Sequence, residues 1–229
     1  MKDILGQALH DYHSGSLKNE LWINNKYGDK EEMPVDIYFR DDENMPDMEW
    51  FALDECRGEV LDIGAGAGSH ALILQEKGLT VTAMDISPLS VKVMRSRGVK
   101  NVEEADIFTY QSTKFDTLLL LMNGIGLAGT LEKLQELLLH LKNLLNPGGQ
   151  ILFDTSDISY LYEDHPKPSD SYYGEIWYQY EYEKQTSDWF QWLYVDEVTM
   201  QSVASASGYN MDVLVEDELG QYLARLTAL

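Results

Sequence analysis

Residues 60–72 read VLDIGAGAGSHAL: an apolar run with one acid, three glycines on alternate positions, and the start of an apolar helix. Val60, Leu61 and Ile63 have the composition of a buried strand, and from Ser69 onward apolar residues recur at helical spacing. A strand that passes through a tight turn into a helix is the first half of a βαβ unit. The stretch therefore predicts an α/β fold whose first turn is built almost without side chains.

The chain after this stretch continues to alternate strands and helices. Strands are expected at 59–63, 80–84, 101–105, 115–122 and 150–154, and helices at 69–77, 88–97 and 130–145. A last helix at 196–207 precedes strands at 210–216 and 221–228. Ser87 and Pro88 suit the N-cap and first position of their helix. Such alternation predicts a parallel sheet with helices on both of its faces.

Two regions depart from this alternation. Residues 1–57 are expected to be mainly helical, including the stretch Leu21-Trp22-Ile23, and to cap the same domain as residues 58–229. Residues 157–194 form an insertion, in which 174–182 alternates as one strand of a β-hairpin. Residues 160–194 hold eight of the fourteen tyrosines and three of the five tryptophans. The insertion fits a substrate lid, a homodimer contact or an ordinary sheet extension, since tyrosine favours strands anyway.

Composition narrows the class of protein. The 229 residues carry a net charge of −22, which repels phosphate backbones and anionic membranes and argues against a nucleic-acid partner. One cysteine, Cys56, excludes a disulfide framework and a cysteine-based zinc site, and we expect no metal. No signal peptide or membrane-spanning run is recognisable in the sequence. We therefore expect a soluble, cytoplasmic protein.

The glycine spacing and three acids point to the kind of ligand. The pattern G-x-G-x-G differs from the nicotinamide fingerprint G-x-G-x-x-G, because Ser69 falls where the third glycine would stand. Asp62 precedes the loop, Asp85 closes the second strand, and Asp106 follows the third. Open α/β sheets bind ligands at the carboxyl ends of their strands. Each of the three acids therefore falls where such a sheet is expected to bind its ligand.

With these motifs the sequence resembles the class I S-adenosylmethionine-dependent methyltransferases, over residues 59–156 and again over 192–229. The resemblance implies a doubly wound, Rossmann-like sheet of seven mostly parallel strands with an antiparallel last strand. It implies that Asp62 serves the amino-acid end of S-adenosylmethionine, that Asp85 binds the ribose, and that Asp106 takes the adenine amino group. The implied cofactor-binding set is Asp62, Gly64, Ala65, Gly66, Gly68, Asp85, Ile86, Asp106, Ile107, Met122 and Asn123.

The acceptor is less defined. The Asn/Asp-Pro-Pro-aromatic motif of adenine amino-methyltransferases is replaced here by Leu121-Met122-Asn123-Gly124, which argues against base methylation and favours a small-molecule acceptor. Asn123 is a candidate catalytic residue, or else a turn-forming Asn before Gly. Arg40 either reaches the site or pairs on the surface with Asp41 or Asp42. Candidate substrate contacts are Arg40, Tyr173, Trp177 and Tyr178. A protein-directed methyltransferase and a catalytically silent binding module are the alternatives.

Overall fold

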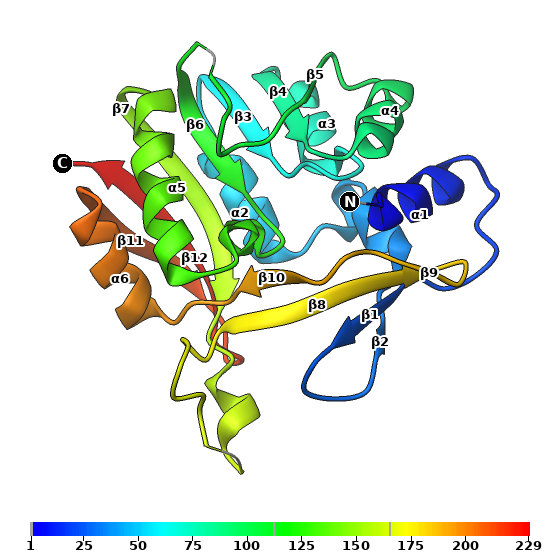
Figure 1. Ribbon diagram of the computed structural model, residues 1–229. Helices are drawn as coiled ribbons and strands as arrows, with labels where there is room; N and C mark the ends of the chain where they lie inside the picture. Colours follow the sequence, from blue (N-terminus) through cyan, green and yellow to red (C-terminus); the bar gives the residue numbers. More distant parts are fainter. Residues whose placement is uncertain (1, 112, 165) are drawn as a thin grey trace.

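The structure, a computed structural model, describes residues 2–111, 113–164 and 166–229, and contains two β-sheets. The larger sheet has seven strands in the order β11-β12-β7-β6-β3-β4-β5 (Figure 1). Its strands are β3 (Glu59–Ile63), β4 (Thr80–Asp85), β5 (Asn101–Glu104), β6 (Phe115–Leu120), β7 (Leu145–Ser156), β11 (Tyr209–Glu216) and β12 (Gln221–Ala228). Strand β12 is antiparallel to both neighbours, while β7, β6, β3, β4 and β5 are parallel. The expected fold class is therefore confirmed.

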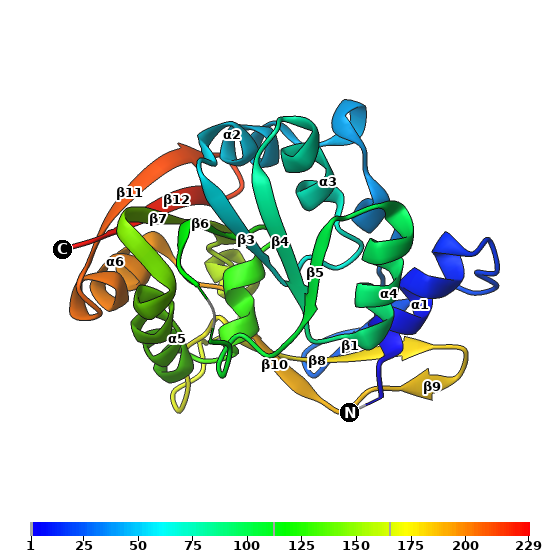
Figure 2. The ribbon, with the colours of Figure 1, turned by 90° about the horizontal axis from the view of Figure 1, so that it is seen from above.

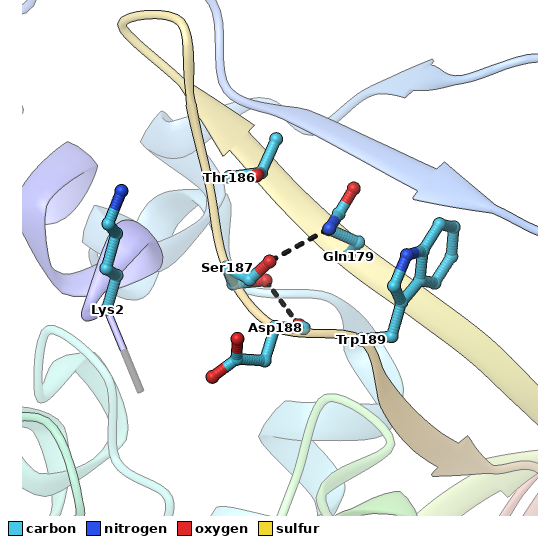
Figure 3. A pocket seen from close by; sticks show the side chains of 6 residues that line it. All are labelled: Lys2, Gln179, Thr186, Ser187, Asp188 and Trp189. Carbon is cyan, nitrogen blue, oxygen red and sulfur yellow. Dashed lines mark hydrogen bonds between the residues drawn. The ribbon is translucent and has the colours of Figure 1, made fainter.

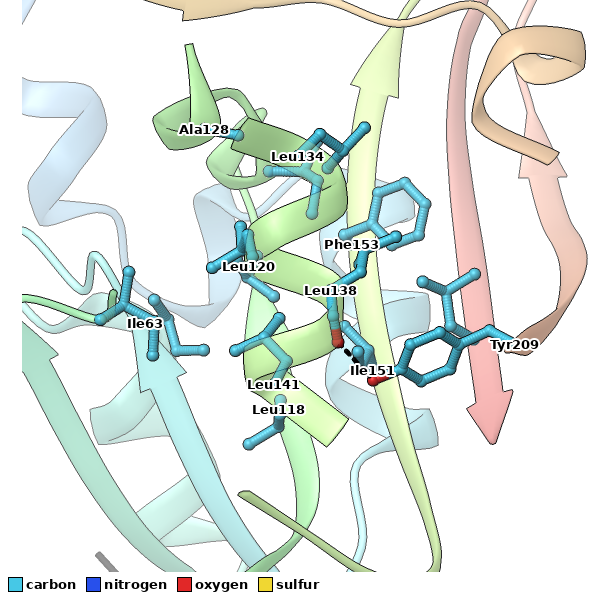
Figure 4. Packing of buried hydrophobic residues seen from close by; sticks show 14 of the residues in the cluster. Ile63, Leu118, Leu120, Ala128, Leu134, Leu138, Leu141, Ile151, Phe153 and Tyr209 are labelled. Carbon is cyan, nitrogen blue, oxygen red and sulfur yellow. Dashed lines mark hydrogen bonds between the residues drawn. The ribbon is translucent and has the colours of Figure 1, made fainter. Parts of the chain in front are cut away.

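Helices cover both faces of this sheet. The helices that do so are α2 (Asp47–Glu55), α3 (Ser69–Glu76), α4 (Pro88–Arg97), α5 (Leu131–Leu144) and α6 (Glu197–Ala206), whereas α1 (Ile4–His13) packs on α4 and on the second sheet. Helices α5 and α6 pack on one face, with buried residues of β6, β7 and β12 (Figure 4). Helices α2, α3 and α4 pack on the other face, against strand residues one position out of phase with the first set. Alternate strand residues thus fill two separate cores, as a sheet buried on both faces requires.

Helix α5 shows how the sequence pattern becomes packing. Its leucines 134, 137, 138, 141 and 144 are buried at helical spacing and fill the first core. At the far edge of that core the Tyr209 hydroxyl donates a hydrogen bond to the Leu138 carbonyl at 2.9 Å, so the buried phenol is satisfied (Figure 4). The stripe of leucines along α5 is therefore the contact that fixes this helix on the sheet.

The second sheet is antiparallel and joins distant parts of the chain. Its strands are β1 (Trp22–Asn25), β2 (Glu31–Glu32), β8 (Glu175–Tyr182), β9 (Gln185–Thr186) and β10 (Phe190–Leu193), in the order β10-β8-β1-β2 with β9 beside β8. The strand expected at 174–182 is confirmed as β8. The helix expected around Leu21-Trp22-Ile23 is wrong, because this stretch pairs with β8 as strand β1. A third apolar cluster, which includes Leu9 and Tyr182, ties α1 to β8.

The second sheet lies across the carboxyl ends of the parallel strands. Figure 2 shows β3, β4 and β5 running toward β1, β8 and β10. Two short 3₁₀ helices, η1 (Val35–Phe39) and η3 (Gly124–Ala128), lie in the chain near this junction. The contact of η3 with β10 includes Trp192, whose indole lies directly over Gly126. The junction of the two sheets is therefore where a ligand site is expected.

Several local expectations hold and one strand ends early. Helix α4 spans Pro88–Arg97 as expected, and the Ser87 hydroxyl accepts the N–H of Ser90 as its N-cap. The strand expected over 115–122 ends at Leu120, because the chain turns sharply at Met122 and Asn123. The last strand before the insertion is longer than expected and covers 145–156. Within the described ranges, no helix combines the length and apolarity that a bilayer crossing needs.

Candidate active site

The glycine loop between β3 and α3 needs its glycines for two different reasons. Gly64, Gly66 and Gly68 all have φ between 56° and 82°, the left-handed region that side chains disfavour. A Cβ at Gly68 would also lie 2.9 Å from the side chains of Met94 and Val99, so this glycine allows α3 to pack on α4. A Cβ at Gly66 would approach the ring of Tyr38 to 3.2 Å. The loop is thus left-handed, compact, and covered at Gly66 by Tyr38.

Asp62 lies beneath this loop at the end of β3. Its side chain is buried, and Oδ2 has no hydrogen-bond partner among the residues that the structure describes. Burial raises the pKa of Asp62 to about 6, against the opposing effect of His70. A buried carboxylate oxygen without a donor is costly unless a ligand supplies one. Asp62 is therefore the strongest single indication of a binding site.

A buried ionic network stands beside Asp62, and sequence reasoning missed it. Glu49 accepts a hydrogen bond from Arg40 at 2.6 Å through one oxygen, and its other oxygen lies 2.6 Å from Nε2 of His70. Burial lowers the pKa of His70, but the hydrogen bond to Glu49 and the carboxylate of Asp62 outweigh it, so the pKa is raised. The expected surface pairing of Arg40 with Asp41 or Asp42 is wrong, because Arg40 is turned inward to Glu49.

Asp85 ends β4 with both carboxylate oxygens already engaged by the backbone. Oδ2 accepts the N–H of Gly66 at 2.9 Å and Oδ1 accepts the N–H of Ser87 at 2.8 Å. Burial raises the pKa of Asp85 to about 6, although both hydrogen bonds lower it. A carboxylate has about four acceptor positions, so lone pairs remain for two further donors. Ile86 follows with 69% of its side chain exposed, an apolar surface at the mouth of the site.

Asp106 and Ile107, the other two residues predicted to contact adenine, lie in different environments. Asp106 is exposed, and its Oδ1 accepts the N–H of Phe108 in a turn, which leaves the other oxygen available. Ile107 instead points into the first core, together with Tyr110 and Met84, and is only 5% exposed. The structure therefore separates these two neighbours: one faces solvent beside the site and the other supports the fold.

The turn after β6 is strained and clamped. Met122 and Asn123 have φ of 59° and 55°, which is unusual for two consecutive residues other than glycine. The Asn123 N–H donates to both carboxylate oxygens of Asp154 at 3.0 Å, and the Asn123 side-chain amide donates to the Leu193 carbonyl at 3.3 Å. Gln221 holds the same carboxylate from β12. The clamp fixes the backbone where β6 opens toward β10.

The predicted substrate residues lie in three different environments. Tyr178 faces the site, and its hydroxyl lies 3.3 Å from that of Tyr194. Trp177 is on the opposite face of β8, where the ammonium of Lys26 stands 3.8 Å from its ring. The Tyr173 hydroxyl donates to the carboxylates of Asp157 and Asp196, so it serves the junction with α6. Only one of the three tyrosine and tryptophan candidates therefore faces the glycine loop's side of the sheet.

A separate groove lies between the start of the chain and the segment around β9 (Figure 3). It is lined by Lys2, Gln179, Thr186, Ser187, Asp188 and Trp189. These residues belong to the chain start and to the hairpin around β9, whereas the buried acids and the glycine loop lie at the strand ends. The chemistry described above is therefore concentrated at the junction of the sheets and not in this groove.

Comparison with known proteins agrees with the site. Residues 39–212 match a family model described as a methyltransferase domain. An S-adenosylmethionine-dependent methyltransferase from Bacteroides fragilis, solved with S-adenosyl-L-homocysteine, is 40% identical, with a TM-score of 0.91 over 99% of this chain and 95% of that one.

Two more distant structures share the fold alone. The CcbJ methyltransferase from Streptomyces caelestis is 12% identical, with a TM-score of 0.63 over 80% of this chain and 90% of its own. The sugar N-methyltransferase KedS8 from a Streptoalloteichus species is 17% identical, with a TM-score of 0.60 over 88% and 96%. From the family match and the close structural relative, the chain belongs to the class I S-adenosylmethionine-dependent methyltransferases, and S-adenosylmethionine is its cofactor.

Proposed function

We propose that the protein transfers a methyl group from S-adenosylmethionine to a small-molecule acceptor held between the glycine loop and the second sheet. The observation that carries this proposal is the buried Asp62, whose Oδ2 has no donor among the described residues and lies next to a loop that a side chain would obstruct. The amino-acid end of the cofactor bears an ammonium that supplies such a donor. The residues present therefore fit the cofactor.

Three acids would hold the cofactor along the strand ends. Asp62 accepts from the ammonium, and the free lone pairs of Asp85 accept from both ribose hydroxyls. Asp106 accepts from the adenine amino group, while Ile86 covers the base with its exposed side chain. Ile107 would contribute only its backbone, since its side chain is part of the core. Gly64, Ala65, Gly66 and Gly68 allow the main chain to approach the ligand.

Arg40 and Asn123 have supporting roles and do not themselves contact the reacting atoms. Arg40 neutralises Glu49, which in turn holds His70 near Asp62, so the network sets the charge beneath the loop. Met122 and Asn123 form a rigid floor where β6 opens, because Asp154 fixes their strained turn.

The chemistry required of the protein is mainly placement. The bound cofactor supplies a methyl group on a sulfonium, which is activated toward in-line displacement. The chain's own residues bring the acceptor atom to roughly 3–3.5 Å from that carbon and exclude water from between them. The half-buried tyrosines of the second sheet support the exclusion of water, since their rings cover the ends of the parallel strands.

Calorimetry on an Asp85 variant tests the cofactor site. Asp85→Ala should weaken S-adenosylmethionine binding about 10- to 100-fold, or roughly 1.5–3 kcal/mol, the scale of hydrogen bonds to a charged group. Asp212→Asn, a matched loss of charge on the exposed edge strand β11, should bind as the wild type does. Equal affinity in all three proteins would refute the assignment.

A labelling experiment tests the acceptor class. The protein, with cofactor that is radiolabelled in its methyl group, is incubated with a cell extract separated into small-molecule and protein fractions. We expect label in the small-molecule fraction. Label in the protein fraction alone would indicate a protein-directed enzyme, and binding without any transfer would indicate a silent module.

A further inference from the structure

The second sheet has an inner face, toward the glycine loop, and an outer face. Directly paired residues of antiparallel strands share a face. By this register the inner face consists of Ile23, Asn25, Glu31, Ile176, Tyr178, Tyr180, Tyr182, Gln185, Phe190 and Trp192. These ten side chains include five aromatic rings and one carboxylate, that of Glu31, and none of the ten is basic. The inner face is therefore aromatic and, in charge, negative.

The lysines of the β1–β2 hairpin lie on the outer face. The Lys26 ammonium is 3.8 Å from the Trp177 ring centroid and 5.4 Å from that of Trp189. Lys30 forms an ion pair with Glu181 at 3.1 Å and lies over Trp22. Lys26 and Lys30 are thus both held on the outer face, away from the carboxylate of Glu31.

The inner face reaches the cofactor site from two sides. On one side Tyr38 covers Gly66, and its ring lies in the same cluster as Tyr180 and the carboxylate of Asp85. On the other side the Trp192 indole lies over Gly126, and the carbonyl of the next residue, Leu193, accepts from Asn123. The tyrosine rings between these points are therefore placed above the floor formed by Met122 and Asn123.

The hydroxyls of this face also have spare hydrogen-bonding capacity. Those of Tyr178 and Tyr194 share a contact of 3.3 Å, which leaves each of them further donor or acceptor capacity. By register, Glu31 shares the inner face with Tyr178 and Tyr180. Burial raises the pKa of Tyr178 and Tyr194. The phenols stay neutral and can donate or accept.

We propose that this inner face binds an acceptor with a protonated amine, recognised by the rings of Tyr178, Tyr180 and Tyr194 and by the carboxylate of Glu31. The inference rests on the proposed function and names its substrate class. Aromatic faces attract a cation, and a carboxylate forms its strongest hydrogen bonds with one. A carboxylate or phosphate acceptor would meet Glu31 and Asp85 with no basic side chain on the face to offset the repulsion.

Methyl transfer to an amine is balanced in atoms and in charge. The bound ammonium first loses one proton to water, which frees the nitrogen lone pair. That lone pair forms the new nitrogen–carbon bond while the carbon–sulfur bond breaks and its electrons remain on sulfur. The products are the methylated ammonium, neutral S-adenosylhomocysteine and the released proton.

Three matched probes test the proposal: 2-phenylethylamine, 2-phenylethanol and phenylacetate. Each carries a phenylmethyl group, and they end in an ammonium, a hydroxyl and a carboxylate. Binding is measured by calorimetry near neutral pH on protein saturated with S-adenosylhomocysteine. The amine should bind about tenfold more tightly than either other probe, the scale of a desolvated cation–π contact together with a charged hydrogen bond.

Glu31→Gln and Glu32→Gln provide a matched pair, because the two neighbours are exposed and point to opposite faces. Glu31→Gln should reduce the amine affinity about fivefold, because glutamine keeps an acceptor oxygen and loses only the added strength of the charged hydrogen bond, and Glu32→Gln should leave it unchanged. Equal effects of the two substitutions, no preference for the amine, or no probe binding at millimolar concentration would each overturn the proposal. Failure of S-adenosylhomocysteine to bind would instead refute the proposed function, so the two failures are distinguishable.

Discussion

The two sheets of the molecule meet at one site but differ in construction. The large sheet is mostly parallel, is buried on both faces, and presents acids at the ends of its strands. The second sheet is antiparallel, with one face toward the site and one toward solvent, and presents tyrosines. The cofactor is common to a whole family, while the acceptor is particular to each enzyme. We infer that the generic ligand is served by the parallel strands and the particular one by the antiparallel sheet.

The contrast extends to how the two sheets are encoded. The central strands of the large sheet follow one another along residues 59–156, with a helix or short turn between most of them. The second sheet joins strands from opposite ends of the chain, since Asn24 contacts Glu181 across 157 positions. The half of the site formed by the large sheet, here called the cofactor half, is therefore built from neighbouring segments. The half formed by the second sheet, to which we assign the acceptor and which is called the acceptor half, is built from distant ones.

The substitution with the largest expected effect, Gly66→Val, disrupts only the cofactor half. Gly66→Val should reduce S-adenosylmethionine affinity at least about 100-fold, or ~2.7 kcal/mol. A β-branched side chain disfavours φ of 56°, and its Cβ would meet Tyr38 at 3.2 Å in the space left for the ligand. Calorimetry with the purified variant measures the loss.

Gly148→Val is the control for backbone strain without the site. Gly148 has φ of 77°, and a Cβ there would have no neighbour within 4 Å. Both variants should lose about 1–3 kcal/mol of unfolding free energy from the disfavoured φ, but only the first should lose the cofactor. Retained thermal stabilisation of Gly66→Val by S-adenosylmethionine would show that the loop is not the binding site.

A smaller expected effect is a dependence of folding stability on pH, and it distinguishes Asp62 from the rest of the cofactor half. Burial raises the pKa of Asp62 to about 6, above its usual 3.8. The folded protein therefore holds this proton more tightly than the unfolded chain does. The resulting stabilisation is fully present below about pH 3.8 and is lost as the pH rises through 6.

Cofactor binding should have the opposite trend, because the ligand's ammonium pairs with the ionised carboxylate. Affinity for S-adenosylhomocysteine should be about tenfold lower at pH 5 than at pH 7, as expected one unit below the pKa. Asp62→Asn should bind weakly and with little dependence on pH over this range. An equally steep pH profile in that variant would assign the titration to Asp85 or Asp154, whose pKa values burial also raises to about 6.

The smallest effect sharpens the acceptor half. Tyr178→Ala should slow methylation of the acceptor identified by labelling about tenfold, and Trp177→Ala less than about twofold, because only the first ring faces the site. Cofactor affinity should stay within a few fold in both. Equal losses of rate would mean that the two faces of β8 contribute alike, and that the face assignment is wrong.

The strand, turn and helix that carry the glycine loop could be predicted from the sequence for a local reason. An apolar strand, a glycine turn and an amphipathic helix each leave a pattern within about a dozen residues, and strand-end acids are then aligned by the parallel sheet itself. Asp62 and Asp85 accordingly lie at strand ends on either side of the loop. Ile107 shows the limit of this reasoning, since neighbouring residues of one turn face opposite ways.

The acceptor half could not be read in the same way. The short apolar run at Leu21–Ile23 fits a helix or a strand, and only its partner β8, far along the chain, decides between them. Glu49 and His70 each look like ordinary helical residues until α2 packs on α3 and brings them to 2.6 Å. The signal available in the sequence was that Glu49 and His70 are each a titratable residue on an otherwise apolar helix face.

The pairing of β1 with β8 also orders events during synthesis on the ribosome. Residues 22–25 emerge early, yet their partner strand ends at Tyr182, so β1 waits for most of the chain to be translated. The strands around the glycine loop have their neighbours much sooner, and contacts close in sequence form faster. We expect the nascent chain to form the strands around the glycine loop before it closes the wall of β1 and β8 opposite them.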